Sequence, residues 1–258
     1  LFRLFKFYVF SPESDTHLGD WGTQLGMLLN ANKKNGDISI IEKKCFKCEK
    51  GWIYGAFDAV SPGFRSKNKC RICLGKGRIS KPVSFEVFSD DFEDMERQAR
   101  IISGWGENVY VKIPITNTRK ESSIPLIQKL YKEGIKLNIT ALMSTRQVVE
   151  LSKILDGETP TVVSVFAGRI ADTGRDPIPF MRRAKIQLNR SKNIELLWAS
   201  PREVLNIYQA NTSGADIITC APDLILKYQT LQYKDLEEFS LETVKMFYND
   251  GKEAGYEL

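Results

Sequence analysis

From residue 83 onward, short apolar runs alternate along the chain with amphipathic segments of helical period. Six runs are rich in β-branched and aromatic side chains and lack a polar face, which predicts buried strands of a parallel sheet. They span residues 83–88, 109–115, 137–142, 162–167, 194–199 and 217–220. The segments between them predict helices over residues 91–103, 124–133, 145–155, 178–189 and 201–209. Asp90, Ser144 and Ser200 stand where helix N-caps are expected.

This repetition of strand and helix predicts an α/β fold with right-handed crossovers, either open and doubly wound or closed into a barrel. A barrel of eight strands needs two more strands from the first 80 residues. Residues 5–10 and 37–41 are the candidates, with a helix over residues 21–32 between them. We therefore predict a (βα)8 TIM barrel whose first two βα units are replaced or degenerate.

Three regions follow from this pattern. Residues 1–42 form a divergent N-terminal segment, residues 43–81 a lysine- and glycine-rich module with paired cysteines, and residues 82–258 the barrel region with strands 3 to 8. Residues 1–81 contain 15 lysine and arginine residues against 7 acidic ones, a net charge of +8, whereas the remainder carries −3. The basic part is compatible with nucleic-acid binding, but we favour a solvated lysine-rich surface around a metal site and expect no nucleic-acid partner.

Composition excludes several classes of protein. Hydrophobic residues make up 42% of the chain and charged residues 27%, which is typical of a globular protein. The apolar runs are too short to cross a bilayer, and Arg3 and Lys6 interrupt the apolar N-terminal segment. We therefore expect a cytoplasmic protein without a signal peptide and without a membrane partner.

The module of residues 43–81 contains two C-x₂-C pairs separated by 21 residues. This spacing is close to that of a four-thiolate zinc site. We predict a structural zinc ion held by Cys45, Cys48, Cys70 and Cys73. Reversible disulfides or a redox pair are the alternatives, because a cytosolic compartment disfavours stable disulfides. Cys220 ends an apolar run and is expected to be a small core residue.

Lys112 lies in the middle of an apolar run, N-V-Y-V-K-I-P-I-T, where a charged side chain is costly without a partner or a function. Burial disfavours the charged form of an amine, and a neutral amine can attack a carbonyl to form a Schiff base. The other predicted strands also carry polar residues, namely Glu86, Asn138, Thr140, Ser164 and Ser200. In a barrel these side chains would surround one pocket near the carboxyl ends of the strands.

Residues 82–258 resemble the transaldolase and fructose-6-phosphate aldolase family of class I aldolases. The motifs are V-Y-V-K-I-P-I-T, G-I-K-L-N-I-T-A-L-M-S and V-F-A-G-R-I-A-D-T-G, with S-F-E-V-F, W-A-S-P-R-E-V and F-S-L-E-T-V-K-M-F in the same order as in a transaldolase-like branch. The resemblance implies that Lys112 forms the Schiff base and that Glu86 and Thr140 hold the catalytic water. The implied substrate-binding residues are Asn138, Ser164, Phe166, Arg169, Ser200 and Arg202. Of these, Arg169, Ser200 and Arg202 would bind the substrate phosphate.

The implied activity is the cleavage or transfer of a three-carbon ketol unit between sugar phosphates through a lysine imine. The resemblance implies sugar-phosphate or small ketose and aldehyde substrates, a homo-oligomer, and no cofactor for catalysis. The family's first-strand aspartate and its T-T-N-P asparagine have no counterpart, since K-F-Y-V-F-S places Phe10 at the aspartate's position. The alternative is a catalytically degenerate homologue, or a chimeric chain whose zinc module binds nucleic acid or protein.

Overall fold

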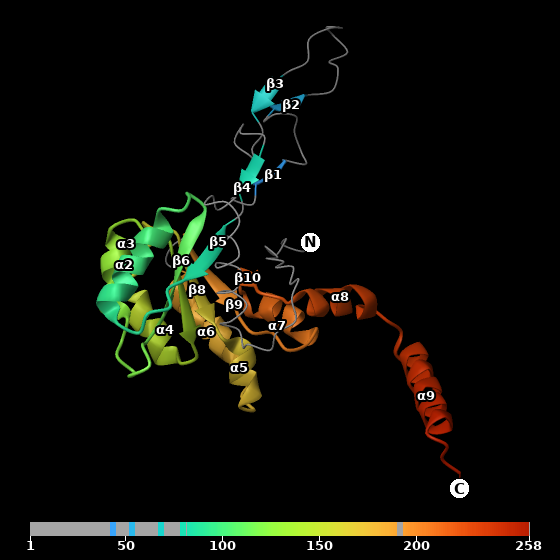
Figure 1. Ribbon diagram of the computed structural model, residues 1–258. Coiled ribbons are helices and arrows are strands. Elements are labelled where there is room, and N and C mark those ends of the chain that lie inside the picture. Colours follow the sequence, from blue (N-terminus) through green and yellow to red (C-terminus); the bar gives the residue numbers. More distant parts are fainter. Residues whose placement is uncertain are drawn as a thin grey trace, which may run out of the picture.

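The computed structural model describes residues 82–189 and 193–257, together with the backbone of residues 42–44, 52–54, 67–69 and 78–80. In this part of the chain six parallel strands form one curled sheet in the order β10-β9-β8-β7-β6-β5 (Figure 1). The strands are β5 (Val83–Glu86), β6 (Val109–Pro114), β7 (Leu137–Leu142), β8 (Thr161–Val165), β9 (Ile194–Trp198) and β10 (Ile217–Ile218). The predicted α/β fold and all six predicted strands of the sheet are confirmed.

Helices follow the strands; α2, α3, α4 and α6 lie along one side of the sheet, whereas α9 extends away from it (Figure 1). They are α2 (Phe92–Ser103), α3 (Ile124–Lys132), α4 (Thr145–Ser152), α5 (Ala167–Asp172), α6 (Pro177–Leu188) and α7 (Leu205–Ser213), then α8 (Pro222–Leu231) and α9 (Leu236–Glu253). Sequence patterns predicted α2, α3, α4, α6 and α7 but not α5, α8 or α9. None of the helices in the described ranges is both long and apolar enough to cross a membrane.

Alternate residues of each strand point to opposite faces of the sheet, and the two faces differ in chemistry. Val111, Ile139, Val163 and Leu196 are fully buried in the main hydrophobic core. We call this side the helix face. The opposite side, which we call the interior face, carries a smaller apolar cluster of Val162, Leu197, Ala199 and Ile217. It also carries the polar side chains predicted to form the site.

The two cap predictions that the structure contradicts both concern loops at the carboxyl end of the sheet. Asp91, not Asp90, caps α2, and its side chain accepts hydrogen bonds from the backbone N–H groups of the first turn. The carboxylate of Asp90 accepts hydrogen bonds from the N–H and hydroxyl of Thr118 instead, at 2.7 Å each. Asp90 therefore joins two loops and is not available as a cap.

Ser200 does not cap a helix either, because α7 begins at Leu205, four residues later than predicted. Ser200 adopts a positive φ of 56°, and Asn206 accepts hydrogen bonds from the N–H groups of Arg202 and Glu203. The turn of residues 200–204 thus has its own hydrogen bonds. The third predicted cap, Ser144, is confirmed, since its hydroxyl and the side chain of Gln147 form a reciprocal capping box.

The N-terminal third contributes four short strands to the described residues. β1 (Glu42–Lys44) pairs antiparallel with β4 (Arg78–Ser80), and β2 (Trp52–Tyr54) pairs antiparallel with β3 (Lys67–Lys69). In the sequence, one cysteine pair lies between β1 and β2 and the other between β3 and β4. The predicted strands 5–10 and 37–41, the predicted helix 21–32 and the four cysteines of the predicted zinc site lie outside the described residues.

Candidate active site

The centre of the interior face is an ion pair between Lys112 and Glu86. β5 and β6 are paired so that these two residues are directly opposite, and Nζ of Lys112 lies 3.0 Å from Oε2 of Glu86. Their side chains are only 16% and 12% exposed. Burial raises the pKa of the Glu86 carboxyl above its usual value, and the neighbouring ammonium group opposes this shift. Lys112 therefore has the partner that a lysine in a buried strand requires.

A chain of hydrogen bonds runs beside this pair across three strands. The amide nitrogen of Asn138 donates to the hydroxyl of Ser84 at 2.9 Å, and the hydroxyl of Ser164 donates to the amide oxygen of Asn138 at 2.7 Å. Asn138 also lies opposite Lys112 in the register of β6 and β7. This chain fixes the orientation of the Asn138 amide next to the lysine.

Thr140 lies one step further toward the carboxyl end of β7. Only 2% of the residue is exposed, yet its hydroxyl has no hydrogen-bond partner among the described residues. A β-bulge follows, where Ala141 has a positive φ of 64° and the register with β8 shifts. Bulges of this kind re-aim side chains next to active sites. The buried hydroxyl of Thr140 can thus serve a water or substrate bound over the Lys112–Glu86 pair.

The segments that carry Arg169 and Ser200 approach each other closely after β8 and β9. The N–H of Gly168 donates to the carbonyl of Ala199 at 3.2 Å. A Cβ atom on Gly168 would lie 1.5 Å from the carbonyl oxygen of Ser200, so only glycine fits there. The contact brings the start of α5 against the turn that contains Ser200.

Cationic and aromatic groups occupy this end of the sheet. The guanidinium of Arg169 lies over the ring of Phe166, 5.3 Å from its centroid. The guanidinium of Arg202 forms an ion pair with Asp172 at 2.9 Å, and both side chains are about half exposed. Arg202 is therefore held at the outer rim, whereas Arg169 is partly buried beside the site.

The structure places five of the predicted site residues on the interior face of neighbouring strands, namely Glu86, Lys112, Asn138, Thr140 and Ser164. The segments that follow β8 and β9 carry the remaining predicted residues, which are Phe166 and Arg169 after β8 and Ser200 and Arg202 after β9. Sequence reasoning missed Ser84, although it precedes Glu86 by two positions in V-S-F-E and therefore shares its face. It also missed Gly168, whose role depends on a contact between distant segments.

Two further polar residues lie on the interior face, toward the amino ends of the strands. Burial raises the pKa of the Tyr110 hydroxyl, and the charge of Glu195 on β9 adds to this shift. Tyr110 precedes Lys112 by two positions, which is the signal that could have predicted its orientation. Among the described residues, no group of three or more histidine, cysteine or acidic side chains is placed to hold a metal ion.

Comparisons with known proteins agree with these motifs. The chain matches the sequence profile described as Transaldolase/Fructose-6-phosphate aldolase over residues 56–258. A probable transaldolase of Brucella melitensis is 31% identical over 183 residues, 70% of this chain and 78% of the relative. A probable transaldolase of Bdellovibrio bacteriovorus is 32% identical over 178 residues, 68% of this chain and 76% of the relative. One of Carboxydothermus hydrogenoformans is 37% identical over 142 residues, 55% of this chain and 63% of the relative.

Proposed function

Because this chain belongs to the transaldolase/fructose-6-phosphate aldolase family, we propose that it is a Schiff-base aldolase or transferase that acts on sugar phosphates. Lys112 forms an imine with a ketose, and a three-carbon ketol unit is released or transferred. The observation that carries this proposal is the Lys112–Glu86 pair, two largely shielded groups 3.0 Å apart on the interior face of the sheet. Enzymes of this family need no cofactor for catalysis.

The reaction begins when the Lys112 amine attacks the C2 carbonyl of the ketose. The amine must first lose its proton, and Glu86 is within hydrogen-bond distance to accept it. The carbinolamine then loses water, to which Glu86 supplies a proton, and a protonated imine remains. The hydroxyl of Thr140, which has no hydrogen-bond partner among the described residues, helps Glu86 to hold this water.

The bond between C3 and C4 breaks next. The C4 hydroxyl gives its proton to the water held by Glu86 and Thr140, the electron pair of the bond moves into the iminium group, and an aldehyde leaves. The remaining enamine attacks the carbonyl carbon of an acceptor aldehyde in a transferase, or takes a proton in a lyase. Water finally hydrolyses the imine and restores the amine.

The neighbouring groups orient the substrate in this proposal. Asn138 and Ser164, already hydrogen-bonded to each other, bind hydroxyl groups of the ketose. The phosphate is bound by Arg169, Ser200 and Arg202. Phe166 packs between the phosphate site and the imine. A guanidinium suits this role because its planar donors match phosphate oxygens.

Borohydride reduction tests the proposal. The unaltered chain and Lys112→Ala are incubated with fructose 6-phosphate, reduced, and mapped by peptide mass spectrometry. We expect a stable adduct on Lys112 only in the unaltered chain. The absence of an adduct on a folded protein would contradict the proposal. It would favour a catalytically degenerate homologue whose cysteine module binds nucleic acid or protein.

We also propose that the protein forms a homo-oligomer, because none of the residues that the structure describes buries α9. In the described structure the 18 residues of α9 include no buried one, and the helix extends away from the sheet (Figure 1). Its exposed apolar side chains are Leu236, Phe239, Leu241, Val244, Met246, Phe247 and Tyr248. A helix gains most of its stability from packing an apolar face, so we expect a second copy to cover it.

Sedimentation analysis tests this oligomer. Phe247→Glu places a charge on the exposed apolar surface of α9, and Lys245→Glu changes a charge on the same helix as a control. We expect the first variant alone to shift the protein toward its monomer mass of 29.4 kDa. A monomeric unaltered chain, or an oligomer that Phe247→Glu leaves intact, would contradict the proposal.

A further inference from the structure

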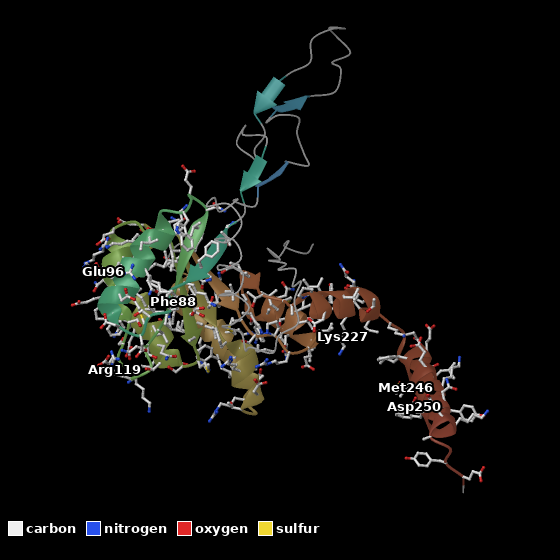
Figure 2. The ribbon with its side chains drawn as sticks, viewed as in Figure 1. Phe88, Glu96, Arg119, Lys227, Met246 and Asp250 are labelled. Carbon is white, nitrogen blue, oxygen red and sulfur yellow. The ribbon has the colours of Figure 1, made fainter. Side chains whose placement is uncertain are left out.

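Ser84 forms a hydrogen bond to a strand that is not its neighbour. It lies on β5 and its partner Asn138 lies on β7, and β6 is between these strands in the sheet (Figure 2). Ser84 is directly opposite Tyr110 in the pairing of β5 with β6, and Asn138 is directly opposite Lys112 in the pairing of β6 with β7. The bond of 2.9 Å therefore crosses β6 between the side chains of Tyr110 and Lys112.

The amide group of Asn138 needs a contact at each end to keep one orientation. The torsion angle that turns an asparagine amide has broad minima, so rotamer preference alone does not fix its plane. Only 7% of Asn138 is exposed, and its oxygen accepts a hydrogen bond from the hydroxyl of Ser164 while its nitrogen donates to Ser84. A serine hydroxyl can either donate or accept, so Ser164 alone binds either end of the amide. Loss of the Ser84 hydroxyl would therefore free the amide to turn and leave a buried N–H without this acceptor.

In the function proposed above, the direction of the substrate places its C1 carbon next to this amide. The phosphate of the ketose lies at Arg169, and the bond between C3 and C4 breaks beside Glu86 and Thr140. C1 is on the opposite side of the imine carbon from these groups and points away from the phosphate. Asn138 precedes Thr140 by two positions, so it lies on the same face of the sheet and further from the phosphate end. The C1 hydroxyl is then the substrate group nearest to the amide.

We propose that Ser84 is a positioning residue that holds the Asn138 amide ready for the C1 hydroxyl of the donor ketose. This inference rests on the function proposed above and adds to it a preference for donors that carry this hydroxyl. An amide held in place before the donor binds loses no further rotational freedom when its hydrogen bond to the donor forms. A donor with a hydrogen atom in place of the hydroxyl gains nothing from the oriented amide.

The test compares fructose 6-phosphate with 1-deoxyfructose 6-phosphate, which differs from it only by the absence of the C1 hydroxyl. Borohydride trapping at increasing donor concentrations gives the concentration for half-maximal labelling of Lys112. We expect Ser84→Ala to raise this concentration about tenfold for fructose 6-phosphate and less than about twofold for the deoxy donor. Ser84→Thr retains an acceptor oxygen and should match the unaltered chain.

Two further variants separate positioning from general support of the fold. Ser213→Ala removes a buried hydroxyl that donates to a backbone carbonyl within α7, and it should leave both concentrations unchanged. In a chain that already carries Asn138→Ala, the addition of Ser84→Ala should cause no further rise, because the amide through which Ser84 acts is gone.

Three results would overturn the inference. An unchanged concentration for fructose 6-phosphate in a folded Ser84→Ala would show that Ser164 alone holds the amide. Equal increases for the two donors would show a general distortion of the site. A further rise in the Asn138→Ala background would show that Ser84 acts independently of the amide. A missing adduct on Lys112 in the unaltered chain would overturn the proposed function itself, whereas a normal adduct with any of the three results overturns only the role of Ser84.

Discussion

The two faces of the sheet are built by the same strands but have opposite chemistry. On the helix face, residues such as Val111, Ile139 and Leu196 are fully buried in the main core. On the interior face, Lys112 forms an ion pair with Glu86, and Asn138 belongs to a chain of hydrogen bonds. The difference teaches that neighbouring positions of one strand can be assigned separately to stability and to chemistry. Substitutions on the two faces should therefore have separable effects.

The largest effect is expected from Lys112→Ala on the interior face. The variant removes the amine that forms the imine, so kcat for sugar-phosphate cleavage or transfer should fall by at least about 10⁴-fold. Turnover is measured from the aldehyde released or consumed, and circular dichroism checks that the protein remains folded. Residual activity within tenfold of the unaltered chain would show that another residue carries the chemistry.

Glu86→Gln should lower kcat by about 10²- to 10⁴-fold, because the amide cannot exchange protons with the lysine and the bound water. It retains the size of the side chain, so binding of the donor should change less than kcat. Steady-state kinetics with the donor varied separates the two parameters. A rise in KM with unchanged kcat would assign Glu86 to binding alone.

The same variant removes a pH dependence of stability. The pKa of Glu86 is raised in the folded protein above 4.5, its ordinary value. The unfolded state therefore loses this proton first as the pH rises, and the contribution of Glu86 to stability is lost between pH 4.5 and the raised pKa. Denaturant unfolding of both proteins across this range should show the unaltered chain losing stability relative to Glu86→Gln. Parallel curves would contradict the raised pKa.

Leu196→Ala on the helix face should lower the stability of the protein but leave kcat nearly unchanged. Leu196 is fully buried, and its truncation leaves a cavity that costs about 2–5 kcal/mol of unfolding free energy. Urea unfolding measures the loss, and kcat at low temperature should stay within a few-fold of the unaltered value. A large loss of kcat in the folded variant would contradict the claim that the helix face contributes to stability and not to catalysis.

Gly168→Ala should have the smallest effect on turnover. The added Cβ would collide with the carbonyl of Ser200, so the start of α5 must move and carry Arg169 with it. We expect KM for a phosphorylated donor to rise about tenfold, corresponding to about 1.4 kcal/mol of binding. KM for unphosphorylated dihydroxyacetone should change little. Equal increases for both donors would show a general distortion of the site.

Much of the fold could be predicted because parallel strands buried on both sides read as apolar runs, and Lys112 was conspicuous in such a run. The helix N-caps were harder to predict from the sequence. Asp90 and Asp91 are adjacent carboxylates, and only the contact with Thr118 decides which of them caps α2. The site around Gly168 depends on the approach of two distant segments, which no local pattern encodes. The start of α7 likewise depends on the hydrogen bonds of Asn206 within the preceding turn.

The most direct test is a crystal structure of the protein after borohydride reduction with fructose 6-phosphate. We expect continuous density from Nζ of Lys112 to the sugar on the interior face, with the phosphate bound by Arg169 and Ser200. An adduct on a different lysine, or a sugar bound on the helix face, would contradict the claim that the interior face is the active site.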